Sequence, residues 1–353
     1  MTAGIGRGIT AARGFRAAGV PCGIKARGRD LALVVSEEPA NAAALFTTNL
    51  AVAAPVLISR EHLHATGGRA RALVTNSGCA NACTGNAGLE AAAFMAAAVA
   101  RAIGCEAQEV LVASTGVIGV ALDVHKVASG ISRAAEQLDA GGGGDAAEAI
   151  MTTDAFPKTH AVEVSSDGGR FRVGGMAKGA GMIEPNLATM LAFLTTDAGV
   201  ESGLLRRALV DACESTFNAI TVDGECSTND SVFLLANGAS GVTIDGGSYD
   251  VFVEGLRAVC RQLATEIVRG AEGATKLVTV RVTGARTYDE AKRAARALAN
   301  SLLVKTALHG GDPNWGRLLA VAGRAGVAFS LRAARAAIGP VVLFDQGQAY
   351  DER

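Results

Sequence analysis

Residues 178–197 read KGAGMIEPNLATMLAFLTTD, and the character of this stretch changes at Thr189. Before Thr189, Gly179 and Pro185 favour a loop, because glycine adopts strained dihedral angles and proline cannot donate a hydrogen bond to a sheet. After Thr189, the apolar run 190–194 predicts a short buried strand. The pattern therefore places a threonine where a kinked loop enters the core.

A threonine in this position can attack its own backbone. The Thr189 hydroxyl would add to the carbonyl of Ala188, and water would then release Thr189 as a new N-terminus. The freed amine has an ordinary pKa of about 7.7–8.0. It can therefore accept the proton of its own hydroxyl near neutral pH, so that one residue supplies both nucleophile and base. The alternative is a threonine that opens an ordinary core strand, and for an arbitrary Ala-Thr pair this alternative is far more common.

The segment from Lys178 to Phe193 closely resembles the self-cleavage segment of the ornithine acetyltransferase (glutamate N-acetyltransferase) family, in the pattern KGAGMIxPNxATMLAF. The resemblance runs from about Gly8 to Arg317. It implies a layered sandwich of mixed sheets and helices, of the α/β (α+β) class, and a nucleophile made by self-cleavage between Ala188 and Thr189. Further similar stretches are Gly19–Lys25, Phe46–Asn49, Asn76–Ala82, Met151–Lys158 and Asp312–Arg317.

Thr115 and Gly116 follow a predicted strand at 110–113 and are candidates for an oxyanion hole. The Thr115 hydroxyl and the Gly116 N–H can point at one developing oxyanion, since glycine lets the backbone approach closely. An ordinary strand-to-helix turn with a capping Ser or Thr is the alternative. Spacing alone favours that turn, but the resemblance reverses the preference, because the family's Thr-Gly oxyanion pair matches these two residues.

The resemblance places substrate contacts at four residues, Thr152, Lys178, Thr189 and Glu272. A partly desolvated Lys178 would suit a substrate carboxylate and would favour the neutral amine of Thr189. Its alternative is a solvated loop lysine. Glu272 suits the cationic amine of an amino acid by charge, and its alternative is a residue at a helix end before a strand.

The function that the resemblance implies is a ping-pong acetyl transfer in arginine biosynthesis. Thr189 would take acetyl from N2-acetylornithine and pass it to glutamate, and bifunctional members also use acetyl-CoA. No cofactor and no metal are expected, because the acyl enzyme carries the group itself. Residues 1–188 and 189–353 would form alpha and beta chains in a heterotetramer of two of each. Two other classes stay open: an N-terminal-nucleophile amidohydrolase of N-acyl amino acids, with water as acceptor, and an inactive truncated homologue.

Two departures from the family pattern stand out. In 221–227, the family more often has Asp-Thr where this sequence has Glu225-Cys226, a mild change. The family also usually continues beyond the position of Arg353 with a segment that supplies an Asn and a Thr to the substrate site. Those two contacts have no counterpart here, which is why the inactive alternative stays open.

Composition excludes several classes of protein. A net charge of -1 over 353 residues gives no reason to expect nucleic acid or acidic membranes as partners. No apolar run approaches the ~20 residues of a membrane helix, and residues 1–13 lack a secretory signal, so a cytoplasmic location is expected. The seven cysteines are an odd number and are expected to be reduced thiols. Cys79 and Cys83 lack zinc-site spacing, and His62 and His64 are expected at a surface helix start.

Periodicity predicts a mixture of helices and strands without strict alternation, which again favours a layered α/β or α+β fold. Helices are expected at 59–64, 89–104, 122–138, 146–151, 204–217, 249–269 and 288–303, strands at 31–35, 43–48, 54–58, 72–75, 110–113, 161–164, 170–175, 232–236 and 277–283, and core segments at 318–322 and 327–330.

Overall fold

The structure is a computed structural model that describes residues 2–3, 6, 8–184 and 190–350. The chain divides into two compact units, Met1–Glu272 and Gly273–Arg353, and each is described by itself. Ala188 and Thr189 lie outside the described residues.

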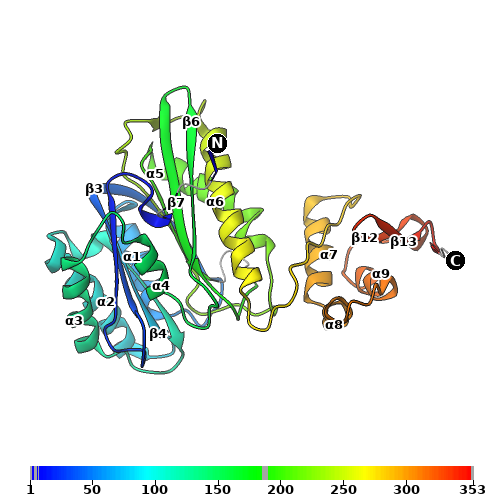
Figure 1. The fold of residues 1–353 in the computed structure, drawn as a ribbon, viewed down its shortest axis with the longest axis horizontal. Helices are drawn as coiled ribbons and strands as arrows, with labels where there is room; N and C mark the ends of the chain where they lie inside the picture. The colour runs from blue at the N-terminus through cyan, green and yellow to red at the C-terminus, as the bar shows by residue number, and fades with distance from the viewer. Residues whose placement is uncertain (1, 4–5, 7, 185–189, 351–353) are drawn as a thin grey trace. The chain divides into compact units, whose positions relative to one another are not determined.

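A mixed sheet is the frame of the first unit (Figure 1), and nine of its strands lie in the described part of the chain. Strands β8 and β10 pair in parallel, as do β4 and β5, and the other neighbours are antiparallel. β8 and β10 therefore lie between β7 on one side and β3 on the other. The order is β1 (Thr2–Ala3), β6 (Lys158–Ser166), β7 (Gly169–Lys178), β8 (Leu191–Thr196), β10 (Ser231–Ala236), β3 (Leu31–Phe46), β4 (Arg69–Cys79) and β5 (Val110–Val117), with β2 (Phe15–Val20) paired to β3.

The two faces of β10 belong to different cores, because successive side chains of a strand point to opposite faces. Val232 and Leu234 pack in the core that contains α5 (Ser202–Glu214) and α6 (Tyr249–Arg269). Phe233 and Leu235 pack in the core that contains α4 (Gly143–Ala149). The sheet is thus covered on both faces, as a layered fold requires.

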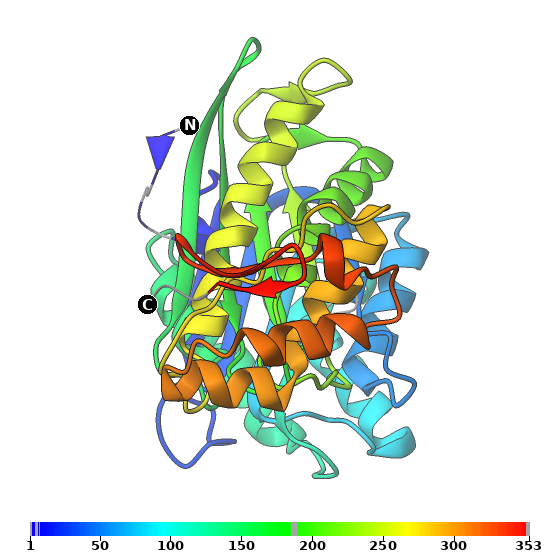
Figure 2. The ribbon, with the colours of Figure 1, turned by 90° about the vertical axis from the view of Figure 1, so that its right-hand side faces the viewer.

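Helices also cover the two ends of this sheet. α2 (Gly85–Ile103) and α3 (Val124–Glu136) share a core with β4 and β5, and α1 (Ala54–Ala65) lies beside them. At the other end, α6 lies along the β6–β7 hairpin (Figure 1 and Figure 2). Phe252 of α6 contacts Phe171 of β7 with ring centroids 5.9 Å apart.

Most elements of the first unit follow the sequence pattern. α6 has the predicted bounds, the β6–β7 hairpin is present, and α2 ends at Gly104, whose φ of 73° suits a helix C-terminus. The strands expected at 31–35 and 43–48 are one long strand, β3, with an irregularity in its pairing between Val35 and Ala40. β2 lies in a segment that shows no strand pattern in the sequence.

Two expectations near residue 60 are wrong. The segment 54–58 is not a strand, because α1 begins at Ala54, with Pro55 in its first turn, where proline favours a helix start. His62 is not on the surface: it is buried, and its Nδ1 lies 2.8 Å from the Val110 carbonyl oxygen. His64 is exposed, as expected.

The second unit has a small core of Leu298, Val304 and Val321. The helix expected at 288–303 is two helices, because Ser301 ends the first and accepts the Val304 N–H at 3.4 Å to cap the second. Its elements are α7 (Tyr288–Asn300), α8 (Leu302–Gly310), α9 (Trp315–Gly323), β12 (Arg335–Ile338), β13 (Val341–Asp345) and β14 (Gln348–Ala349).

Two predictions in this unit are wrong. Residues 277–283 have no regular structure, and Leu277 and Val278 are each 44% exposed. Alternation indicates a strand only where another strand is available to pair with it. The segment 327–330 is half-buried to exposed rather than core, whereas 318–322 lies within α9.

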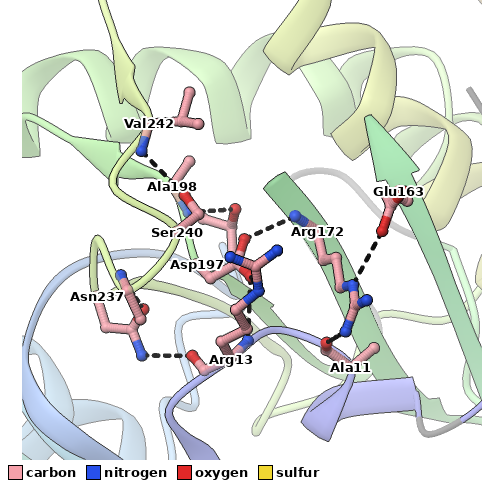
Figure 3. Close-up of polar contacts among 11 residues, drawn as sticks. Ala11, Arg13, Glu163, Arg172, Asp197, Ala198, Asn237, Ser240 and Val242 are labelled. Carbon is pink, nitrogen blue, oxygen red and sulfur yellow. Dashed lines mark hydrogen bonds and ion pairs between the residues drawn. The ribbon is translucent and has the colours of Figure 1, made fainter. Parts of the chain in front are cut away.

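Asp197 fixes the C-terminal end of β8 (Figure 3). Its buried carboxylate accepts the backbone N–H of Arg172 at 2.7 Å and that of Arg13 at 3.2 Å. The Asp197 carbonyl accepts the Ser240 N–H at 2.8 Å. β8 is thereby attached to β7 and to an early segment of the chain. Since β8 begins two residues after Thr189, a cut before Thr189 would leave the new terminus attached to a firmly held strand.

Candidate active site

The predicted site residues that the structure describes all line one pocket of about 630 Å³. Met190, which follows Thr189 in the sequence, lines the same pocket. Ala188 and Thr189 themselves, the predicted cleavage pair, lie outside the described residues. The pocket therefore brings together, from distant parts of the chain, Thr115, Gly116, Thr152, Lys178 and Glu272.

Lys178 links the two threonines of the pocket. Its Nζ donates to Thr152 Oγ1 at 2.7 Å and to Thr115 Oγ1 at 3.1 Å. Lys178 is the last residue of β7, so its backbone is held in the sheet and it is not a solvated loop lysine. Burial lowers the pKa of Lys178, against the opposing effect of Asp154 and other nearby carboxylates. The ammonium is thus largely desolvated and gains from any anion that enters the pocket.

Thr115 and Gly116 lie within β5 and not at a helix start, so the alternative of a helix cap is excluded. The next helix, α3, is capped by Asp123 instead. Gly116 has a φ of 134°, and a Cβ added to it would lie 2.3 Å from the carbonyl carbon of Gly78. No side chain fits there, because real Cβ atoms do not approach a backbone so closely.

Replacing Gly116 by alanine is expected to lower kcat about 100-fold, because the clash with Gly78 would displace the backbone N–H that we expect to serve as an oxyanion donor. The measurement is the reaction that the resemblance implies, acetyl transfer from N2-acetylornithine to glutamate. Gly119→Ala is the matched control, since Gly119 also has a positive φ, 80°, but an added Cβ there meets nothing within 4 Å. A Gly116→Ala protein with the kcat of the Gly119→Ala protein would contradict the proposed role of this backbone position.

Asp154 and Lys158 are important residues that the sequence analysis missed. Both side chains are 0% exposed, and Lys158 Nζ lies 2.6 Å from Asp154 Oδ1. Asp154 also accepts the backbone N–H of Gly179 at 2.7 Å and that of Thr152 at 3.1 Å. The sequence carried two signals: both residues lie in the stretch Met151–Lys158 that resembles the family, and Pro157 between them argues against a surface helix.

Asp154 therefore fixes the backbone beside two site residues, Thr152 and Lys178. Burial alone would raise the pKa of Asp154, but the charges of Lys178 and Lys158 and the hydrogen bonds that it accepts hold its pKa below the ordinary value. The carboxylate is thus ionised at neutral pH and holds its donors strongly.

The chain on both sides of residues 185–189 is fixed to the segment 222–231. On the upstream side, Asp223 accepts the N–H groups of Met182 at 2.5 Å and Ile183 at 2.8 Å. On the downstream side, the Ser231 N–H donates to the Met190 carbonyl at 2.9 Å. Met182 has a φ of 59°, which is unusual for a residue with a side chain, so this segment is held in a strained conformation.

Asn229 connects the same segment to β5, the strand that carries Thr115 and Gly116. Its Nδ2 donates to the Ala80 carbonyl at 2.6 Å and to the Ser114 carbonyl at 2.9 Å. Asp230 also lines the pocket, and burial raises its pKa well above the ordinary value. Neither residue has a role that was predicted from the sequence.

Glu272 lies at the rim of the pocket and is exposed. Its backbone N–H donates to the Ala180 carbonyl at 2.8 Å, and a Cβ added to Gly181 would lie 3.2 Å from Glu272 Oε1. The residues directly after it, 273–287, form no strand, and among the described residues its carboxylate accepts no hydrogen bond. Glu272 is therefore available to a cationic group in the pocket.

Other kinds of site are absent from the residues that the structure describes. They contain no group of three or more His, Cys, Asp or Glu side chains that could hold a metal ion. No helix among them has the length and apolar character needed to cross a membrane. All seven cysteines are free.

A profile of the ArgJ family matches residues 16–353. The arginine biosynthesis bifunctional protein ArgJ of Chlorobaculum tepidum is 52% identical over 321 residues, which cover 90% of this chain and 78% of that relative. This chain belongs to the ArgJ family. The family predicted from the motif around Thr189 is therefore confirmed.

Two solved structures resemble this ArgJ-family chain. ArgJ of Bacillus halodurans is 38% identical, with a TM-score of 0.50 over 53% of this chain and 100% of the solved chain. Ornithine acetyltransferase of Mycobacterium tuberculosis, solved in complex with ornithine, is 47% identical, with a TM-score of 0.49 over 52% of this chain and 98% of the solved chain. The layered α/β fold predicted from the sequence is confirmed by the Bacillus halodurans structure.

Proposed function

We propose that this ArgJ-family chain transfers acetyl from N2-acetylornithine to glutamate through an acetyl ester on Thr189, after it has cleaved its own Ala188–Thr189 bond. The chain is an acetyltransferase of arginine biosynthesis, as its family membership at 52% identity implies. The route through Thr189 is supported by one observation above all: the oxyanion pair, Lys178 and the residue that follows Thr189 line the same pocket.

Self-cleavage would begin when the Thr189 hydroxyl oxygen attacks the carbonyl carbon of Ala188. The C–N bond breaks, the nitrogen takes up the proton, and the chain is joined by an ester until water hydrolyses it. Residues 1–188 and 189–353 then become the alpha and beta chains. The solved chain of Bacillus halodurans ArgJ supports this division into two products. Its whole length matches 53% of the 353 residues here, or about 187 residues, which is the length expected for one product.

In the transfer reaction, the free amine of Thr189 would accept the proton of its own hydroxyl as the oxygen attacks the acetyl carbonyl of the donor. The tetrahedral intermediate carries a negative oxygen that the Thr115 hydroxyl and the Gly116 N–H can stabilise. Collapse breaks the amide bond, and the ornithine nitrogen leaves with the proton from the Thr189 ammonium. Glutamate then attacks the ester with its amine, and the same steps run in reverse to regenerate Thr189.

Lys178 would bind the α-carboxylate that both substrates share, and its charge would favour the neutral form of the Thr189 amine. The hydroxyl of Thr152, which accepts a hydrogen bond from Lys178, would also contact this α-carboxylate. Glu272 would bind the side-chain ammonium of the donor. We also propose acetyl-CoA as a second acetyl donor, as the bifunctional name of the relative suggests. The proposed enzyme needs no cofactor, lies in the cytoplasm and forms a heterotetramer of two alpha and two beta chains.

Freshly expressed wild-type protein is expected to contain two fragments by intact-mass spectrometry, residues 1–188 and 189–353. The second fragment should begin Thr-Met-Leu-Ala-Phe by Edman sequencing. A single intact chain that nevertheless transfers acetyl would overturn the cleavage step.

The acceptor is tested by measuring ornithine, acetate and N-acetylglutamate together. With N2-acetylornithine and glutamate, ornithine and N-acetylglutamate are expected in equal amounts. Equal rates of acetate release with and without glutamate would instead assign the chain as an amidohydrolase. No turnover at all would indicate an inactive homologue.

A further inference from the structure

Lys25 is a second lysine in the pocket, and the proposed function leaves it without a role. It lies between β2 and β3, and its Nζ donates to the Met151 carbonyl at 3.1 Å, next to Thr152 in the chain. A Cβ added to Gly78 would lie 2.9 Å from Lys25 Cγ, so the lysine stem passes directly over this glycine. Gly78 in turn contacts Gly116. Lys25 therefore borders the strand ends that carry the oxyanion pair.

The backbone of Lys25 is held in place by Asp30, which is 0% exposed. The Asp30 carboxylate accepts the N–H groups of Cys22, of Gly23 at 3.0 Å and of Lys25 at 2.8 Å. Three donors on one buried carboxylate make a rigid turn, because hydrogen bonds to an ionised acceptor are the strong ones. Lys25 is thus presented from a fixed base, with only its side chain free to adjust.

The ammonium of Lys25 has capacity for a further partner. It carries three N–H donors, and the Met151 carbonyl takes one of them. No carboxylate in the described part of the chain lies within ion-pair distance of it: the nearby Glu148 accepts from Arg29 at 2.7 Å, and Asp154 pairs with Lys158. Lys25 is half-buried, and this burial lowers its pKa, so its charge would gain from an anion.

The two substrates of the proposed reaction make different demands on one pocket. N2-acetylornithine carries one carboxylate and a side-chain ammonium, whereas glutamate carries two carboxylates. In the proposed binding mode, Lys178 binds the carboxylate of the donor and Glu272 binds its side-chain ammonium. The second carboxylate of glutamate needs a second cation. Among the described residues that line the pocket, Lys25 and Lys178 are the basic side chains.

We propose that Lys25 binds the side-chain carboxylate of glutamate and so determines the preference for glutamate as acceptor. This inference rests on the proposed function, whose donor and acceptor it takes as given. Donor and acceptor side chains would then bind through separate residues, Glu272 for the ammonium and Lys25 for the carboxylate, while Lys178 holds the group that they share.

Two reactions of one enzyme test the assignment. The first is transfer from N2-acetylornithine to glutamate, and the second is exchange of labelled ornithine into N2-acetylornithine, in which no substrate has a side-chain carboxylate. Lys25→Met keeps the stem and removes the charge. It is expected to raise the KM for glutamate about 10- to 100-fold, as the loss of a charge-assisted hydrogen bond does. The exchange rate should change less than about threefold. Lys25→Arg, which keeps the charge, should recover much of the glutamate affinity.

Lys126→Met is the control for loss of a lysine, because Lys126 is exposed and its ion-pair partner is Asp123. It should leave both reactions unchanged. Equal losses of transfer and exchange in Lys25→Met would overturn the inference, since they would mean that Lys25 supports Thr152 or the shared carboxylate. An unchanged KM for glutamate would overturn it as well. Wild-type protein without transfer or exchange would instead overturn the proposed function, and with it this assignment.

Discussion

Thr189→Ala protein is expected to remain a single uncut chain and to lose acetyl transfer by at least about 10⁴-fold, the scale seen when a nucleophile is removed. Without the hydroxyl, neither the attack on the Ala188 carbonyl nor the attack on the acetyl group has a nucleophile. Intact-mass spectrometry and the transfer assay report the two effects on one sample. The wild-type chain has a mass of 35.6 kDa before any cut, so the fragments are easily separated from it.

Thr189→Ser is the matched control, because it keeps a hydroxyl at the same position. It should still be cut and should retain part of the activity. Cleavage of the Thr189→Ala chain at the same bond would show that another group breaks it, and the proposed mechanism would then fail. Normal transfer by an uncut Thr189→Ala chain would exclude the acetyl ester on this residue.

Asp154→Asn is expected to destabilise the protein by about 3–5 kcal/mol, because it leaves the Lys158 ammonium buried without its counter-charge. Acetyl transfer should also fall, since Thr152 and Gly179 share the Asp154 carboxylate as hydrogen-bond acceptor. The free energy of unfolding is measured with urea, and transfer is measured at a temperature where the variant stays folded.

The double variant Asp154→Asn, Lys158→Met separates the effect of Asp154 on protein stability from its effect on the positions of Thr152 and Gly179. Removing both charges should recover most of the lost stability, because a buried ion pair contributes little over apolar groups. Acetyl transfer should stay low, since the backbone N–H groups of Thr152 and Gly179 would still lack their anionic acceptor. Full recovery of transfer in the double variant would show that Asp154 matters only through Lys158.

The stability difference between wild type and Asp154→Asn should also depend on pH. The pKa of Asp154 is lowered in the folded protein from its ordinary 3.8, so its contribution is fully present above that value. It is lost as pH falls through the folded pKa. The stability difference between wild type and Asp154→Asn should therefore be constant near pH 7 and should shrink in acid.

The parts of this fold that depend on local pattern could be predicted from the sequence. The apolar face of α6 and the glycine that ends α2 each need only neighbouring residues to be recognised. Thr115, Gly116 and Lys178 could be singled out as pocket residues because each lies in a distinctive motif. Where they meet could not be derived from spacing, since they lie on β5 and β7, which are not neighbours in the sheet.

The features that sequence reasoning missed all depend on distant partners. Asp154 acts on Gly179, 25 residues away, and Asn229 on Ser114, 115 residues away. The alternating segment 277–283 shows the opposite error, because a local strand pattern was present there but no strand formed. Lys25 ends one of the stretches that resemble the family, Gly19–Lys25, but only the structure shows that it lies beside Met151 and Gly78.

The order of strands in the central sheet has a consequence for the matured enzyme. β8 and β10 would belong to the beta chain, yet alpha-chain strands flank them on both sides. Two polypeptides interleaved in this way cannot dissociate without loss of the sheet, so they would remain one particle throughout purification. Once denatured, however, the pair would have to reassemble by a second-order reaction that depends on concentration. The native arrangement would then be far easier to reach before the cut than after it.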